Sequence, residues 1–251
     1  MMTDDELLRY SRQIMLPDVD IEGQEKICAG RVAIIGLGGL GAPAAIYLAS
    51  SGVGSLTLVD DDDVEISNLQ RQIIHTEDSL NSPKVLSGKV AIERLNSRTN
   101  VEIIDRRVDE DEMAALASRV DVMLDATDNF TTRYALNRAC LRTKTPLVSG
   151  AAIRMEGQIS VFDPRHDDSP CYQCLYRDGL DEALNCAENG VLAPMVGIIG
   201  TMQAMEVLKL LGEFGESLVG KVIYFDAKTM QIRSFKLNRD PNCVACSSTS
   251  A

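Results

Sequence analysis

Apolar residues in this chain alternate between short continuous runs and longer stretches with a period of three to four. The short runs are typical of buried β-strands, and the periodic stretches are typical of amphipathic helices. Up to residue 142 we expect strands at 31–35, 55–59, 101–104 and 120–125, and helices at 40–51, 84–95, 110–118 and 129–142. Strand, helix and strand in this order form βαβ units, whose crossover connections make a sheet parallel.

The two ends of the chain carry different patterns. Near the N-terminus the spacing predicts an amphipathic helix over 4–16 and a second helix over 21–29. Later runs predict a strand at 146–148 and antiparallel strands at 158–162, 222–225 and 231–237. They also predict a long apolar helix over 194–211 and an irregular segment over 163–189. The predicted fold class is therefore α/β: a Rossmann-like, mostly parallel sheet with helices on both faces and additional C-terminal antiparallel strands.

Composition is that of a folded globular protein. The chain has 251 residues, 45% hydrophobic and 25% charged, and we expect a single domain over 1–251. Its formal net charge of -12 disfavours a general attraction to nucleic acid or anionic lipid. The N-terminus lacks the apolar segment of a secretory signal, and the longest apolar stretch, 191–202, is shorter than the roughly 20 residues that cross a bilayer. We expect a cytoplasmic protein with no nucleic-acid or membrane partner.

A glycine loop, GLGGLG at 36–41, follows the first predicted strand and opens a helix. Backbone N–H groups at such a helix start suit a phosphate. Asp60, at the end of the next strand, is placed to accept hydrogen bonds from ribose hydroxyls. This pattern fits NAD and ATP equally, and a tight turn without a ligand is the third interpretation.

Basic residues near the loop favour a triphosphate. Arg71 and Lys84, with Arg12 from the first helix, would offset an otherwise acidic surface, although lone basic residues are more often only surface charge. Asp128, with Asn129, follows a buried strand and offers oxygen ligands to Mg²⁺. The alternative role for Asp128 is that of N-cap of the next helix, and both roles can hold together.

Four of the seven cysteines form two CxxC pairs. Four thiolates at this spacing favour a closed, structural zinc site, with redox CxxC pairs as the weaker alternative; the ligands would be Cys171, Cys174, Cys243 and Cys246. Cys186 lies in the irregular segment, where it is either an exposed reactive thiol or inert. Cys28 and Cys140 have the character of small hydrophobes, and His75 and His166 have no partner visible in the sequence.

With these motifs together, from about residue 4 to 247, the chain resembles the MoeB/ThiF family of ubiquitin-activating-like adenylyltransferases, which activate sulfur-carrier proteins. The resemblance rests on the segments 9–14, 36–41, 67–72, 125–129 and 150–158, on Lys84 and on both cysteine pairs. The run 153–157 and the first cysteine pair look most like the molybdopterin-synthase branch of molybdenum cofactor biosynthesis. The branch that serves thiamine thiazole biosynthesis is the close alternative.

The resemblance implies a reaction in which the C-terminal Gly-Gly carboxylate of a small ubiquitin-like carrier attacks the α-phosphate of ATP. It also implies Mg²⁺ and Zn²⁺ as cofactors, and a homodimer in which Arg12 of one copy reaches the phosphates of the other. Arg12, Arg71, Lys84, Asp128 and Cys186 are the candidates for the chemistry. The nucleotide would be held by Gly36, Gly38, Gly39, Gly41, Asp60, Ser67, Asn68, Leu69, Gln70, Arg71, Lys84, Asp128 and Asn129.

The resemblance also divides the chain by role, with N-terminal helices over 4–29, a nucleotide-binding part over 30–150 and a carrier-binding and zinc part over 151–247. Some relatives carry an appended rhodanese domain, whereas this sequence ends at Ala251. We therefore expect sulfur to come from a separate donor, a cysteine desulfurase or rhodanese. A NAD-dependent oxidoreductase and a non-catalytic partner subunit are the rival interpretations; the first does not explain Arg71, Lys84 or the cysteines.

Overall fold

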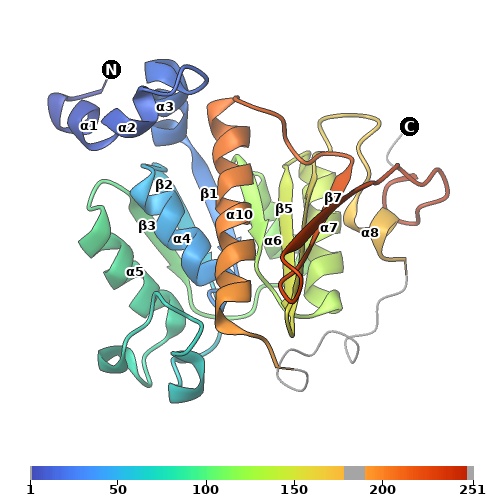
Figure 1. The fold of residues 1–251 in the computed structure, drawn as a ribbon. Helices are drawn as coiled ribbons and strands as arrows, with labels where there is room; N and C mark the ends of the chain where they lie inside the picture. Colours follow the sequence, from blue (N-terminus) through green and yellow to red (C-terminus); the bar gives the residue numbers. More distant parts are fainter. Residues whose placement is uncertain (1, 178–189, 248–251) are drawn as a thin grey trace.

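One eight-stranded sheet organises the computed structural model, which describes residues 2–177 and 190–247. The strand order is β3-β2-β1-β4-β5-β6-β7-β8 (Figure 1). The first five strands in the chain, β1 to β5, are parallel to one another. Strands β6, β7 and β8 are antiparallel to their neighbours. The strands are β1 (Arg31–Ile35), β2 (Ser55–Val59), β3 (Asn100–Ile104), β4 (Val122–Asp125), β5 (Leu147–Ile153), β6 (Glu156–Phe162), β7 (Lys221–Asp226) and β8 (Gln231–Lys236).

Helices cover both faces of the sheet, as predicted (Figure 1). On one face, apolar residues of α3 (Asp20–Ala29), α4 (Gly41–Ser50), α5 (Lys84–Leu95) and α10 (Ala193–Gly212) pack in one core cluster with β1 and β2. On the other face, α6 (Glu110–Ala117), α7 (Phe130–Thr143) and α8 (Tyr172–Leu175) form a second cluster. Two short 3-10 helices, η1 (Ile66–Asn68) and η2 (Glu77–Ser79), connect β2 to α5.

The single N-terminal helix predicted over 4–16 is wrong. The segment forms two short helices, α1 (Asp4–Arg9) and α2 (Ser11–Ile14), separated at Tyr10. Tyr10 is buried, and its hydroxyl accepts a hydrogen bond from Asn96 Nδ2 at 3.0 Å. A side chain at Gly52 would collide with the Tyr10 ring, so this tertiary contact replaces the continuous local pattern.

The long irregular segment contains the short helix α8, and Cys186 lies outside the described residues. Beyond it, α10 is long and apolar enough to meet the length and composition criterion for a membrane span, alone among the helices of the described ranges. However, 61% of that window is buried in the protein, where α10 packs against α4 and β5. Its apolar character is therefore that of a core helix.

Candidate functional site

A large cavity lies at the carboxyl ends of β1, β2 and β4. Within the sheet, β2 and β3 lie on one side of β1, and β4, the next strand in the chain, lies on the other side of β1. This reversal leaves a crevice outside the strand ends, which is where open α/β sheets bind ligands. The cavity has a volume of about 1040 Å³, at the upper end of what a small-molecule site needs.

The glycine loop forms one wall of this cavity. Gly36 has φ +89, and a Cβ there would lie 2.8 Å from the carbonyl oxygen of Ala126. A Cβ at Gly41 would lie 2.0 Å from the carbonyl oxygen of Gly36, so both positions require glycine. At Gly38, in contrast, a Cβ would meet only Gln72 Nε2, at 3.7 Å. The loop backbone at Gly38 therefore borders the cavity, next to a helix start whose N-cap, Leu40, offers no side-chain acceptor.

Asp60 and His75 fix the loop through its residue Leu37. Asp60 Oδ2 accepts from the Leu37 N–H at 2.6 Å, and Oδ1 accepts from the Asp62 N–H at 2.9 Å. Burial raises the pKa of Asp60, against the effects of Lys84 and of these two N–H donors. A carboxylate holds about four lone-pair sites, so Asp60 retains capacity for a ribose hydroxyl.

His75 supports the same residue, although no partner for it was visible in the sequence. Its Nε2 lies 3.2 Å from the carbonyl oxygen of Leu37 and its Nδ1 lies 2.9 Å from Ser87 Oγ. Burial lowers the pKa of His75 to about 4. The ring is therefore neutral near pH 7, with Nε2–H donating to Leu37 and Nδ1 accepting from Ser87.

Basic side chains also line the cavity. Lys84, at the start of α5, is buried, and its Nζ lies 2.6 Å from Asp62 Oδ2. Arg71 donates from NH1 to the carbonyl oxygen of Ser67 at 3.1 Å. Sequence reasoning missed three arginines that line the cavity, Arg106, Arg107 and Arg133. Arg106 and Arg107 follow the carboxyl end of β3, so the strand-end argument that selected Asp60 applies to them as well.

Three neighbouring carboxylates of the acidic run, Asp60, Asp61 and Asp62, each offer an oxygen within 4.8 Å of the others. Their charges already have partners. Arg107 Nε lies 2.7 Å from Asp61, Lys84 pairs with Asp62, and Asp60 accepts two backbone hydrogen bonds. This run is therefore less suited to a cation than its charge suggests.

Asp128 and Asn129 sit on the loop between β4 and α7. Asp128 is exposed at the cavity wall. The N-cap of α7 is Asn129, whose Oδ1 accepts from the Thr132 N–H at 2.8 Å, so the alternative that made Asp128 the N-cap is wrong. Asn129 has the extended backbone of an N-cap, and Asp128, the residue before it, lines the cavity.

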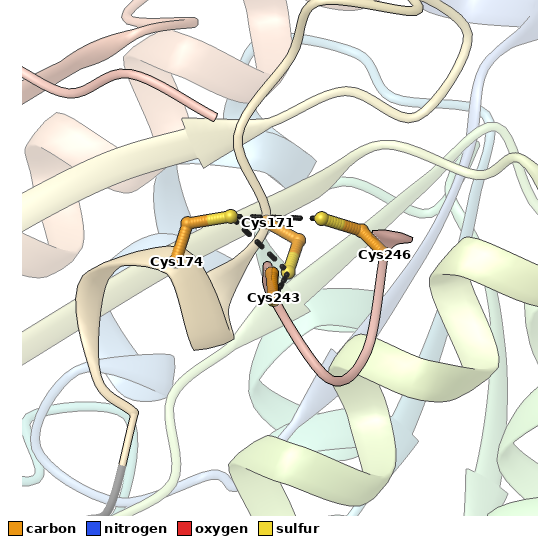
Figure 2. Close-up of side chains that lie close together, drawn as sticks. All are labelled: Cys171, Cys174, Cys243 and Cys246. Atoms are coloured by element: carbon orange, nitrogen blue, oxygen red, sulfur yellow. Dashed lines mark hydrogen bonds between the residues drawn. The ribbon is translucent and has the colours of Figure 1, made fainter. Parts of the chain in front are cut away.

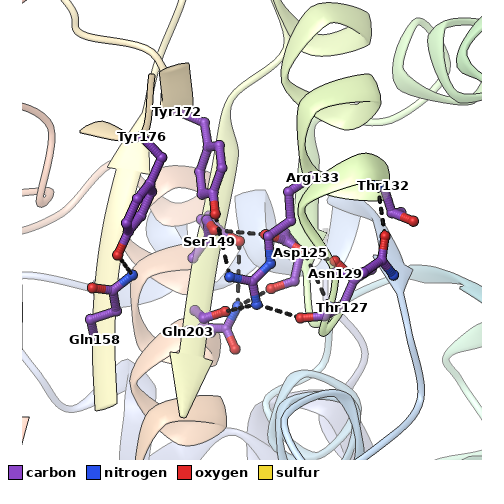
Figure 3. A network of polar contacts seen from close by, with 12 residues as sticks. Asp125, Thr127, Asn129, Thr132, Arg133, Ser149, Gln158, Tyr172, Tyr176 and Gln203 are labelled. Carbon is purple, nitrogen blue, oxygen red and sulfur yellow. Dashed lines mark hydrogen bonds and ion pairs between the residues drawn. The ribbon is translucent and has the colours of Figure 1, made fainter. Parts of the chain in front are cut away.

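A buried polar network lies beneath this loop (Figure 3). Asp125 Oδ1 accepts from the N–H and hydroxyl of Thr127 at 3.0 and 2.7 Å, and its Oδ2 accepts from Ser149 Oγ at 2.7 Å. Arg133 Nε lies 3.6 Å from Asp125 Oδ2, and Gln203 Nε2 donates to the Asp125 carbonyl oxygen at 2.6 Å. Sequence reasoning missed Arg133 and Gln203, because no local pattern links α7 and α10 to β4.

Nine of the predicted nucleotide-binding residues line the cavity: Gly36, Gly38, Gly39, Asp60, Asn68, Arg71, Lys84, Asp128 and Asn129. Within the described ranges, Gly41, Ser67, Leu69 and Gln70 are not part of that lining. Gly41 packs closely against the backbone of Gly36, and the carbonyl oxygen of Ser67 accepts a hydrogen bond from Arg71. Arg12 is exposed on α2 and does not line the cavity of its own chain either.

The four paired cysteines meet at a second site (Figure 2). The two pairs that form it are far apart in the sequence. Their sulfurs lie within 4.8 Å of one another; the Cys171–Cys243 and Cys174–Cys246 sulfurs are 3.6 Å apart and the Cys171–Cys174 sulfurs 3.9 Å apart. Zn–S bonds of about 2.3 Å in a tetrahedron require sulfurs about 3.8 Å apart. The Asp240 N–H donates to Cys174 Sγ at 3.4 Å, and the hydrogen bond between the Cys171 and Cys174 sulfurs lowers the pKa of Cys174. The cluster is compatible with zinc.

Comparisons with known proteins agree with this geometry. The model of the ThiF family matches residues 10–245. The chain is 49% identical to the molybdopterin-synthase adenylyltransferase of Escherichia coli, over 98% of both chains. It is 42% identical to the sulfur carrier protein ThiS adenylyltransferase of the same organism, over 100% of this chain and 99% of that one.

A solved structure extends the likeness to three dimensions. The crystal structure of MccB from E. coli with ATP superimposes with a TM-score of 0.79 and 25% identity, covering 90% of this chain and 69% of that chain. The family model covers most of the chain, and two relatives above 40% identity span it almost completely. The chain therefore belongs to the ThiF family.

Proposed function

We propose that the protein uses ATP to adenylate the C-terminal Gly-Gly carboxylate of a small ubiquitin-like sulfur-carrier protein, which prepares the carrier for thiocarboxylation in molybdenum cofactor biosynthesis. The observation that carries this proposal is the cavity at the strand-order reversal. It joins a glycine loop, two basic side chains, Arg71 and Lys84, and the carboxylate of Asp128. The 49% identity to the molybdopterin-synthase adenylyltransferase of E. coli supports the choice of pathway.

The reaction joins a carboxylate to a phosphorus atom. A carrier carboxylate oxygen attacks the α-phosphate, the new acyl–phosphate bond forms, and the bond to the β-phosphate breaks with release of pyrophosphate. No side chain bonds to phosphorus, so the protein accelerates the step by positioning and by offsetting negative charge. Lys84 and Arg71 are suited to that task, because they line the same cavity as the glycine loop.

Magnesium would neutralise part of the triphosphate charge. We assign it to Asp128 and not to the acidic run 60–63, because Asp61 and Asp62 are paired with Arg107 and Lys84. Mg²⁺ usually takes one or two protein carboxylates together with phosphate oxygens, which a single exposed aspartate beside the phosphates satisfies. Asn129, which caps α7, holds Asp128 at the start of that helix.

The cysteine cluster would hold one structural Zn²⁺. Four thiolates leave no open coordination position for water, so the ion would connect α8 to the C-terminal segment and take no part in the transfer. Cys171 and Cys174 flank α8, whereas Cys243 and Cys246 follow β8.

A second copy of the chain would complete the site. Arg12 lies on α2 outside its own cavity, so contact with a nucleotide requires the cavity of a partner. Large apolar side chains close to Arg12 in the sequence are exposed, as expected of a surface that a homodimer buries: Leu8, Met15 and Leu16.

A sulfur donor and the cellular location belong to the same proposal. The acyl-adenylate contains no sulfur, so a donor must supply it after adenylation, and we expect a cysteine desulfurase or rhodanese. Cys186 would act only at that later step. We expect the protein to work in the cytoplasm, together with its carrier.

The second candidate function is the equivalent step on the thiamine branch. It is favoured by the 42% identity to the ThiS adenylyltransferase over the whole of this chain. The two functions share the nucleotide site and differ only in the carrier. A NAD-dependent reaction is the weakest candidate, because Lys84 and Arg71 have no role in it.

Nucleotide choice is tested by titration calorimetry. We expect Mg²⁺ with ATP to bind, and NAD not to bind, because basic groups on two elements surround the space next to the glycine loop. Tight binding of NAD with no heat from ATP would contradict the proposed function.

A further inference from the structure

Arg133 is a buried arginine at the cavity that contacts β4, β5, α8 and the loop between β4 and α7. Its side chain is 3% exposed. NH2 donates to the carbonyl oxygens of Thr127 and of Gly150, the latter at 3.1 Å, and NH1 donates to the Tyr172 hydroxyl at 3.4 Å. Figure 3 shows the guanidinium between Asp125, Thr127 and Tyr172. Lysine, with one donor position, cannot make these contacts together.

The hydrogen bond from Arg133 to the Thr127 carbonyl oxygen restricts the orientation of the peptide group that leads into Asp128. The Thr127 carbonyl belongs to the peptide group that joins Thr127 to Asp128, and a trans peptide is planar, with its N–H opposite its C=O. Asp125 holds Thr127 from the other side, through its N–H and its hydroxyl. Both ends of residue 127 are therefore fixed, and with them the start of residue 128.

The network is built for geometry more than for stability. Arg133 Nε and Gln203 Oε1 are buried without a hydrogen-bond partner among the described residues, which costs free energy. Buried ion pairs in general add little to folding stability compared with apolar side chains of the same volume. A buried Arg133–Asp125 pair at 3.6 Å is thus better explained by the conformation that it imposes on the loop above it.

Tyr172 connects this network to the cysteine cluster. It follows Cys171 directly and begins α8, which carries Cys174. Its backbone N–H donates to Asn137 Oδ1 of α7 at 2.9 Å, and its ring packs against Tyr134 and Phe162. One end of this residue is therefore held by the cysteine cluster, while its hydroxyl accepts from Arg133.

We propose that Arg133 is a positioning residue that orients the Thr127–Asp128 peptide, and that Tyr172 makes this orientation depend on metal in the cysteine cluster. The structural link stands independently; only its effect on ATP rests on the proposed function. Loss of the metal loosens α8, the Tyr172–Arg133 contact lengthens, and the loop 126–129 samples other conformations. Metal bound at one site then favours nucleotide at the other.

Amide hydrogen exchange of the loop 126–129 tests the link without any nucleotide. We expect Arg133→Lys in the zinc-loaded protein, and removal of metal from the wild type by a chelator, each to speed exchange in this loop about tenfold or more, as loss of a charged hydrogen bond predicts. Chelation should add little in Arg133→Lys. Arg138→Lys, on the same helix but paired with Glu110 at the surface, is the matched control and should leave exchange unchanged.

Calorimetry with Mg²⁺ and ATP measures the consequence. Arg133→Lys should weaken binding about tenfold, and the double variant with Asp128→Asn should bind no worse than Asp128→Asn alone, because one change acts through the other. Additive losses, or wild-type exchange in a folded Arg133→Lys, would overturn the proposal. If Arg133→Lys does not fold, Tyr172→Phe decides, since unchanged exchange there removes the link. A wild type that fails to bind ATP refutes the proposed function, and the exchange experiment still tests the positioning role.

Discussion

Replacing Lys84 with alanine is expected to slow adenylation by roughly 10²-fold or more, the magnitude typical when a preorganised group that stabilises transition-state charge is removed. Lys84 is buried and lies at the start of α5, with its Nζ 2.6 Å from Asp62. Its ammonium group is thus held in place before any substrate binds. The measurement is carrier-dependent exchange of pyrophosphate into ATP.

Lys89→Ala is the matched control for Lys84→Ala. Lys89 is on the same helix and makes a half-exposed pair with Glu93 at 3.7 Å, away from the cavity lining. Asp62, the partner that Lys84→Ala leaves behind, is 62% exposed and can be solvated, so the variant should remain folded. Exchange within about threefold of the wild-type rate in Lys84→Ala would remove Lys84 from the account of the chemistry.

The second large effect is expected at the cysteine cluster. Protein purified without added metal should contain one zinc per chain, because four sulfurs already lie at tetrahedral spacing. Structural zinc sites contribute about 10–16 kcal/mol of apparent binding free energy in small zinc-finger peptides, so Cys243→Ser should lose the metal and be strongly destabilised. Elemental analysis and urea unfolding measure both quantities.

Cys28→Ser serves as the control, since Cys28 is half-buried beside Gln24 and lies outside the cluster. It should keep the full zinc content. Less than about half an equivalent of zinc in the wild type, with the four clustered thiols freely titratable, would contradict a structural metal.

The parallel half of the fold could be predicted from local pattern. Strands β1 and β2 and helix α5 begin and end at the predicted residues, because each is a short apolar run or a periodic stretch with a clear boundary. The four cysteines that are compatible with zinc could also be identified from the sequence, because the CxxC spacing is a local signal.

What could not be predicted depends on contacts between residues far apart in the chain. Tyr10 ends α1 because it packs with Gly52 and Asn96, and the helical pattern of 4–16 contains no sign of this. His75 finds its partners in Leu37 and Ser87. Buried polar networks, in which side chains from distant parts of the chain form hydrogen bonds, are specified by tertiary structure alone. In the sequence, their members look like ordinary polar positions on helices.

The central claim is that a carrier carboxylate becomes an adenylate, and intact mass measurement of the carrier tests it most directly. Carriers of the molybdopterin and thiamine branches, each ending in Gly-Gly, would be incubated separately with the protein, Mg²⁺ and ATP, next to versions that lack the final glycine. We expect one carrier, the molybdopterin-branch protein, to gain the mass of one AMP with release of one pyrophosphate, and the truncated forms to stay unchanged. A folded, zinc-loaded protein that binds ATP yet adds AMP to neither carrier would contradict the account.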